Sequence, residues 1–165
     1  KNSKCFSRQI GSVLVKNNTI VSTGYNGPPR GVRHCNEWNQ EEGWPIDNNE
    51  KICPRRKMGY KSGEGIHLCP AVHSERSSLL AAAMNGISTK DAILYCHCGV
   101  PCAHCMIEII NAGVKKIVCL AGQTPYDNLG VIYAKDAGLT IIEVDSEGMY
   151  TGGCVSPEKV IPRML

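Results

Sequence analysis

The fold of this chain follows from one stretch, which begins His73-Ser74-Glu75 and ends Pro101-Cys102-Ala103-His104-Cys105. One imidazole and two thiolates can hold a Zn²⁺ ion on three sides and leave its fourth position for water, as in a catalytic zinc site. Glu75 lies two residues from the histidine, so we expect its carboxylate beside the metal but not bound to it. A carboxylate in that position can take a proton from the water and later pass it to a leaving amine.

Each half of this stretch indicates little on its own. A Cys-x-x-Cys pair in a cytosolic protein is as often a redox motif or half of a structural zinc site, and His-x-Glu occurs readily by chance. In this order, with a helix–strand–helix pattern between them, the two halves match the H-x-E…P-C-x-x-C pattern of zinc nucleobase deaminases. The sequence therefore predicts a catalytic zinc held by His73, Cys102 and Cys105, with Glu75 as the proton-transferring group.

Length and composition favour a single domain of a cytoplasmic enzyme, in the host-cell cytoplasm if the protein is viral. The 165 residues suffice for one core, no apolar run reaches the roughly 20 residues of a membrane span, and we expect no signal peptide. The formal net charge of +3 suits a small anionic substrate better than a nucleic acid. The chain starts at Lys1, so we expect a trimmed start that lacks a first helix. Ten cysteines without an export signal indicate metal ligands and reduced thiols.

Hydrophobic periodicity and turn residues predict a mixed α/β fold. Strands are expected at about 9–16, 19–23, 91–98, 115–120 and 139–144, and helices at 73–85, 102–111 and 126–137. Alternating strands and helices indicate a largely parallel sheet covered by helices. Pro101 is expected in the first turn of its helix. Both halves of the zinc motif fall at helix starts, where the sites of such sheets gather. The last twenty residues show little pattern, and the whole chain, 1–165, is interpreted as one domain.

Residues 32–70 have no clean period and are rich in Gly, Pro and Asn. A segment of that length rarely orders without its own core, and a bound metal would order it. We therefore consider a second, structural zinc, with candidate ligands Cys5, His34, Cys35, Cys53, His67 and Cys69. The alternative is that these are buried free cysteines and surface histidines.

Several other residues receive simpler interpretations. The run 55–57 (Arg-Arg-Lys) is interpreted as a solvated face, with a phosphate contact as the less favoured alternative. Cys96 and Cys98 are expected to be buried small side chains, although a ligand role for Cys98 is conceivable. His104 lies on another face of its helix and is interpreted as a bystander.

The sequence resembles the deoxycytidylate (dCMP) deaminases of the zinc-dependent cytidine deaminase superfamily, in particular a microbial and phage branch. The resemblance runs from the strand at 10–15 to about residue 144. Besides the zinc motif it depends on Gly24-Tyr25-Asn26-Gly27-x-Pro29-x-Gly31, Asn111-Ala112-Gly113, and the segment from Cys53-Pro54 to Cys69-Pro70. The first of these motifs is the most specific, because the entire superfamily shares the zinc motif. The resemblance implies a cytidine deaminase-like three-layer α/β/α fold with a five-stranded mixed sheet, in which 32–70 is an insertion.

The resemblance also implies an activity, the hydrolytic deamination of dCMP to dUMP and ammonia, which supplies dUMP for thymidylate synthesis. In that case Glu75 shuttles protons beside the catalytic zinc, and the substrate contacts are Asn26, Ser74 and Tyr126. A second zinc would use Cys5 and Cys35, completed from Cys53, His67 or Cys69. Relatives of this kind are commonly hexamers, activated by dCTP and inhibited by dTTP with Mg²⁺, which bind near residues 26–31.

Three positions depart from the family pattern. Ser74 replaces the usual alanine, Arg76-Ser77 follows the glutamate, and Met84 stands where relatives carry an arginine that is a candidate for phosphate recognition. Phosphate or effector contacts are therefore sought among Gly27, Arg30, Arg33 and Arg76. The alternatives to a dCMP deaminase are a bifunctional dCMP/dCTP deaminase, a tRNA-type deaminase and a non-catalytic zinc-binding module. The small net charge does not favour the tRNA alternative.

Overall fold

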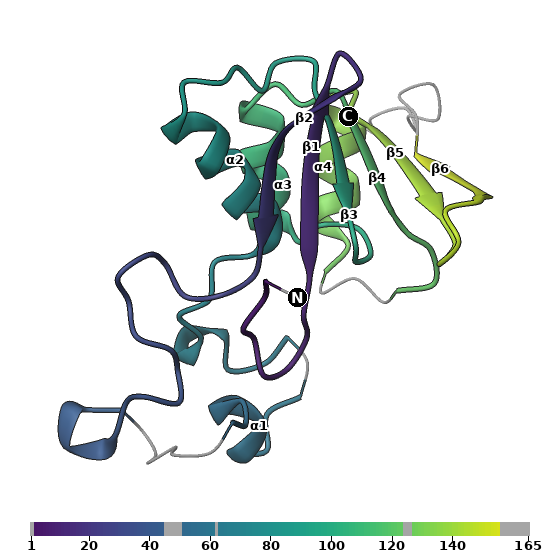
Figure 1. Ribbon diagram of the computed structural model, residues 1–165. Coiled ribbons are helices and arrows are strands. Elements are labelled where there is room, and N and C mark those ends of the chain that lie inside the picture. Colours follow the sequence, from purple (N-terminus) through teal and green to yellow (C-terminus); the bar gives the residue numbers. More distant parts are fainter. Residues whose placement is uncertain (1, 45–50, 62, 124–126, 156–165) are drawn as a thin grey trace, which may run out of the picture.

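A single sheet positions the candidate site. The computed structural model describes residues 2–44, 51–61, 63–123 and 127–155. Within them, six strands form one sheet in the order β2-β1-β3-β4-β5-β6 (Figure 1). The strands are β1 (Gly11–Lys16), β2 (Thr19–Tyr25), β3 (Ile93–Cys96), β4 (Lys116–Leu120), β5 (Thr140–Val144) and β6 (Tyr150–Val155). Strands β3, β4 and β5 are parallel, β1 is antiparallel to β2 and β3, and β6 is antiparallel to β5.

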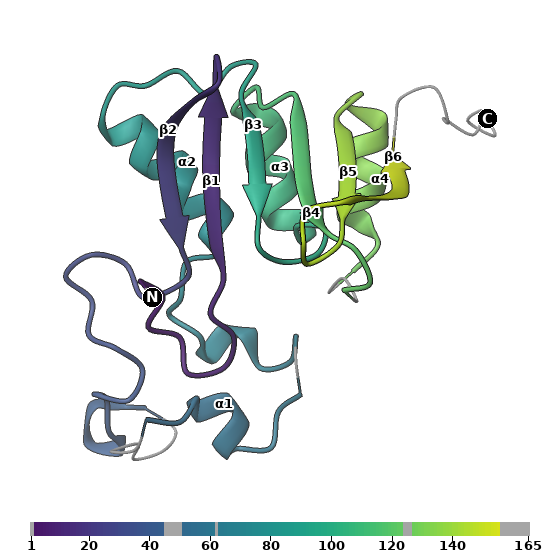
Figure 2. The same ribbon diagram turned by 45° about the vertical axis from the view of Figure 1, so that its right-hand side comes forward.

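One face of the sheet forms the core. Leu14, Leu94, Ile117 and Ile141 are register partners across β1, β3, β4 and β5, and all four are fully buried. Because side chains alternate between the two faces of a strand, this row of aliphatic residues fixes which face is covered. Helices α2 (Ser74–Met84), α3 (Ala103–Asn111) and α4 (Leu129–Asp136) pack on it (Figures 1 and 2).

The opposite face presents Val13, Tyr95 and Val118, which are register partners across β1, β3 and β4. A three-layer arrangement would place helices here, but the described part of the chain contributes none to this face (Figure 2).

None of the helices in the described ranges has the length and apolar character that a bilayer crossing requires.

The five predicted strands are present, and β6 is an addition. Its sequence, Tyr-Thr-Gly-Gly-Cys-Val, lacks the alternation that identifies strands. A turn at Asp145 directs it back to β5, because Oδ1 of Asp145 accepts hydrogen bonds from the backbone N–H groups of Glu147 and Met149. The helix positions are close to those predicted, but Pro101 precedes its helix. Cys102 is the N-cap of α3, with an extended ψ of 163°, so Pro101 lies outside the first turn.

The 32–70 segment has little regular structure among its described residues. It holds 3₁₀ turns at Gln40–Glu42 and Ile66–Leu68 and the four-residue helix α1 (Pro54–Lys57). The segment lies beyond the end of the sheet where β1 begins and β2 ends (Figures 1 and 2). Since α2 begins at the same end, residues of this segment come close to the first turn of α2.

Candidate metal centre and active-site pocket

Three of the predicted metal ligands meet at the starts of two neighbouring helices. His73 is the N-cap of α2, Cys102 is the N-cap of α3, and Cys105 lies in the first turn of α3. Nδ1 of His73 lies 3.6 Å from Sγ of Cys102 and 3.3 Å from Sγ of Cys105. All three donor atoms lie within 4.8 Å of one another. One imidazole and two sulfurs form a donor set that suits zinc.

Hydrogen bonds among the three donors distribute their protons unequally. The hydrogen bond from Cys105 lowers the pKa of the Cys102 thiol to about 4. The same hydrogen bond, together with burial, raises the pKa of Cys105. The pKa of His73 is raised, chiefly by its hydrogen bond with Cys102. Two of the three donors therefore hold protons more firmly than usual and must release them when a metal binds.

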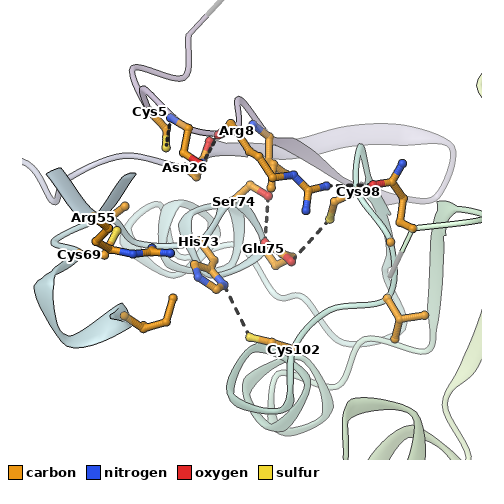
Figure 3. Close-up of a pocket in the computed structure, with 17 residues that line it drawn as sticks. Cys5, Arg8, Asn26, Arg55, Cys69, His73, Ser74, Glu75, Cys98 and Cys102 are labelled. Atoms are coloured by element: carbon orange, nitrogen blue, oxygen red, sulfur yellow. Dashed lines mark hydrogen bonds between the residues drawn. The ribbon is translucent and has the colours of Figure 1, made fainter. Parts of the chain in front are cut away.

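The carboxylate of Glu75 lies between two hydrogen-bond donors. Glu75 is 5% exposed and occupies the first turn of α2. The hydroxyl of Ser74 donates to Oε2 at 2.9 Å, and the thiol of Cys98 donates to Oε1 at 3.8 Å (Figure 3). Both oxygens are thereby held in one orientation. Ser74, which was predicted to contact substrate, directs its hydroxyl to this carboxylate.

Cys96 and Cys98 are buried, as predicted, with exposed fractions of 5% and 8%. A hydrogen bond with Cys98 raises the pKa of Cys96. With Glu75 they form a second group whose donor atoms lie within 4.8 Å of one another. The contact of Cys98 with the carboxylate was not predicted, since it depends on how the chain turns after β3.

The pocket around these groups draws on four parts of the chain. It is lined by His73, Ser74 and Glu75 at the start of α2, by Cys98, Gly99, Val100 and Cys102, by Arg8 and Asn26 of the N-terminal part, and by Arg55 and Cys69 of the 32–70 segment. Figure 3 shows these side chains around one space.

The amide of Asn26 makes three hydrogen bonds within the protein. Its Oδ1 accepts from the hydroxyl of Ser3 and the N–H of Ile10, and its Nδ2 donates to the carbonyl of Arg8. A contact of Asn26 with the deoxyribose stays a prediction. Tyr126, the third predicted substrate contact, lies outside the described residues.

Four of the candidate ligands for a second zinc interact electrostatically. Burial, together with charges on Cys53, Cys69 and Cys5, raises the pKa of Cys35 to about 12. His67 is exposed. In the described residues these cysteines do not form a group as tight as that of His73, since only that group and the Glu75 group hold three donors within 4.8 Å.

The arginines predicted to contact phosphate lie elsewhere. Arg33 pairs with Glu42 at 2.6 Å and Arg76 with Glu108 at 2.8 Å. Gly27 and Arg30 line a separate depression together with Met84. The arginines that line the pocket are Arg8 and Arg55. The run 55–57 was interpreted as a solvated face, which is wrong for the buried Arg55 although residues 56 and 57 are exposed. The less favoured alternative for this run, a phosphate contact, stays a prediction.

A mixed sheet that carries a His/Cys/Cys donor set and a buried glutamate at two helix starts defines the class of zinc-dependent deaminases. A model of the cytidine and deoxycytidylate deaminase zinc-binding region matches residues 1–121. The deoxycytidylate deaminase of Schizosaccharomyces pombe is 36% identical over 118 residues, covering 72% of this chain and 32% of that protein. The deoxycytidylate deaminase of phage T4 is 32% identical over 133 residues, covering 70% and 68%. The chain belongs to the cytidine and deoxycytidylate deaminase family.

The chain matches only part of some of these relatives. It spans 32% and 39% of the lengths of the two matched yeast deoxycytidylate deaminases. Among solved structures, the dCMP deaminase of cyanophage S-TIM5 in complex with dCMP and dUMP superimposes with a TM-score of 0.57 at 23% identity, covering 84% of this chain and 82% of that one. This likeness confirms the predicted cytidine deaminase-like α/β fold, with a sixth strand in addition to the expected five.

Proposed function

We propose that the protein deaminates dCMP hydrolytically to dUMP and ammonia, with a zinc ion held by His73, Cys102 and Cys105. The observation that carries the proposal is the Glu75 carboxylate, which is buried in the pocket and fixed at both oxygens by Ser74 and Cys98. A carboxylate fixed beside three metal donors is positioned for proton transfer and has no other evident task there. The family membership and the deoxycytidylate deaminases among its relatives support the same reaction.

The residues have separate tasks in this reaction. The zinc ion, when bound, activates water for attack. Glu75 takes a proton from the water as the C4–O bond forms, and it delivers a proton to the amino group as the C4–N bond of cytosine then breaks and ammonia leaves. The second proton of the water ends on N3 of the uracil ring. Ser74 and Cys98 keep the carboxylate aimed while it gains and loses this proton. Burial excludes bulk water, which strengthens each of these interactions.

The proposal is tested by ammonia release from the zinc-loaded protein, given dCMP, dCTP and deoxycytidine in parallel. Glu75→Gln should lower the rate by at least the roughly 10²–10⁴-fold that is typical of general acid–base catalysis. Glu108→Gln is the matched control, because Glu108 is half-buried and pairs with Arg76 outside the pocket. Full activity of Glu75→Gln would eliminate the assigned role. Turnover of dCTP alongside dCMP would favour the bifunctional alternative.

We further infer a second, structural zinc in the 32–70 segment, bound by Cys5, Cys35, Cys53 and Cys69. The charges on Cys53, Cys69 and Cys5 that act on the thiol of Cys35 support this set over one that includes the exposed His67. The remaining expectations stay predictions: a hexamer, regulation by dCTP and by dTTP with Mg²⁺, a role in nucleotide biosynthesis, and a cytoplasmic location.

A further inference from the structure

Arg55 is a buried cation whose side chain is not fully paired. It is 9% exposed, and its Nε is buried without a hydrogen-bond partner. Within the described ranges no carboxylate forms an ion pair with it; the ion pairs found there are Arg33–Glu42 and Arg76–Glu108. A buried guanidinium is normally paired, because an unsatisfied charged donor costs more free energy than a neutral one. The missing partner therefore requires an explanation.

The side chain of Arg55 points into the pocket of the proposed reaction. It extends from α1 toward His73, on the side of the pocket opposite Cys98 (Figure 3). The other pocket arginine, Arg8, already donates to Oε1 of Gln123 at 3.0 Å. The next residue along α1, Arg56, is exposed and donates to the carbonyl of Tyr60. Of these three arginines, Arg55 is the one both buried in the pocket and left with an unpaired donor.

A phosphate group would supply the anionic hydrogen-bond acceptor that Nε of Arg55 lacks. Guanidinium groups bind phosphate through two or more parallel, charge-assisted hydrogen bonds, and Nε commonly takes part. Met84 and Arg30 line a different depression, so neither of these positions supplies a cation to the pocket itself.

We propose that Arg55 binds the 5′-phosphate of the deoxycytidine nucleotide and so makes the pocket selective for nucleotides over nucleosides. This inference rests on the proposed function, since it names the part of the substrate that Arg55 recognises. A purely structural alternative exists. A zinc ion bound by four thiolates is a dianion, and Cys69 lines the same pocket, so Arg55 could simply neutralise that charge. The two roles predict different effects on different substrates.

The experiment compares kcat/KM for dCMP with kcat/KM for deoxycytidine in the zinc-loaded full chain. For Arg55→Gln we expect a loss of about 10- to 100-fold on dCMP, the range of a charge-assisted hydrogen bond, and less than about a twofold change on deoxycytidine. Arg55→Lys keeps the positive charge but loses the forked N–H donors of the guanidinium, so its kcat/KM for dCMP should lie between those of the parent protein and Arg55→Gln. Arg56→Gln is the matched control and should leave both substrates unchanged.

Zinc content and direct binding separate the remaining outcomes. Equal losses on both substrates, or a lower zinc content in Arg55→Gln, would overturn the proposal in favour of the structural role. An unchanged rate on dCMP would also overturn it. If the parent protein turned over neither substrate, the proposed function would fail, and calorimetry with dUMP and deoxyuridine would still test Arg55. Selective loss of dUMP binding in Arg55→Gln would then support the phosphate site, and equal binding to the parent and the variant would eliminate it.

Discussion

At the scale of single residues, the metal donors differ sharply in proton affinity. Cys102 and Cys105 are one helical turn apart and share a hydrogen bond, which lowers the pKa of Cys102 to about 4 and raises that of Cys105. A second thiol of the core, Cys119, has its pKa raised to about 12 by burial. At neutral pH the metal-free protein therefore holds Cys102 as a thiolate, whereas Cys105 and Cys119 are thiols.

This difference predicts selective alkylation. In zinc-free protein at pH 6, iodoacetamide should modify Cys102 well before Cys105 or Cys119, because only a thiolate attacks and Cys102 is also partly exposed. Its rate should stay nearly flat from about pH 6 to 8, since this range lies above its pKa, whereas an ordinary thiol gains roughly tenfold per pH unit below its own. Peptide mass mapping gives the rates. A tenfold rise per pH unit at Cys102 would contradict the assigned charge, and added zinc should protect it.

The sequence predicted these donors, but not how the residues beside them are used. His73, Glu75, Cys102 and Cys105 are recognisable because the chemistry demands those residue types in that order. The contact of Cys98 with Glu75 depends on rotamers and on the turn after β3, and no local pattern encodes it. The burial of Arg55 likewise depends on how the four-residue helix α1 is rotated, since the neighbouring Arg56 is exposed.

At the scale of elements, the close approach of α2 to β2 positions His73 and Glu75. Gly24 near the end of β2 makes this approach possible. A Cβ at Gly24 would lie 2.2 Å from the carbonyl oxygen of Ser74 and 2.4 Å from the backbone nitrogen of Ser78. The hydroxyl of Ser12 in β1 also donates to the carbonyl of Ser74 at 2.7 Å. The first turn of α2 is thus pressed against the two strands.

Gly24→Ala should therefore force α2 away from the sheet. We expect a destabilisation of about 1–3 kcal/mol, as for other overpacked sites, and a fall in Tm of several degrees. Zinc affinity should fall as well, because His73 moves with the helix. Gly27→Ala, two residues beyond the end of β2, is the control, since its Cβ would meet nothing within 4 Å. Thermal unfolding of both variants tests this prediction. Equal Tm values would show that the contact between Gly24 and the first turn of α2 is not tight.

Elements with strong periodicity were predicted to within a few residues, and those without it were not. β1 is recognised from its alternation and from the Asn17-Asn18 turn, in which both residues have positive φ. β6 was missed because its two glycines interrupt the pattern, so its pairing with β5 is a tertiary effect. That residues 1–165 form one domain stays a prediction.

At the scale of the whole molecule, two parts differ in burial. The sheet has a continuous hydrophobic core, whereas the 32–70 segment has very few buried residues. None of the described residues of the 32–70 segment except Cys53, Pro54 and Arg55 is buried. The aromatic contacts there are Phe6 with His34, at 4.4 Å between ring centroids, and Trp38 with Trp44, at 4.5 Å. Two ring contacts supply roughly 0.5–1.5 kcal/mol each beyond their area. Ordering about forty residues costs far more.

If the proposed second zinc supplies the free energy that orders the 32–70 segment, removing the zinc should loosen this segment and leave the sheet intact. Treatment with a chelator should then raise the rate of tryptic cleavage by at least about tenfold, the effect of a loss of roughly 1.4 kcal/mol in local stability. The new cuts should fall at Arg33, Arg56, Lys57 and Lys61, whereas Lys116 in β4 stays protected by its pairing with β3 and β5. Cys35→Ala should reproduce this pattern in the presence of zinc. Cys119→Ala, which removes a buried thiol of β4, should not. Identical cleavage with and without chelator would mean that protein contacts alone order the segment, and Arg55 would then owe its position to those contacts and not to a metal.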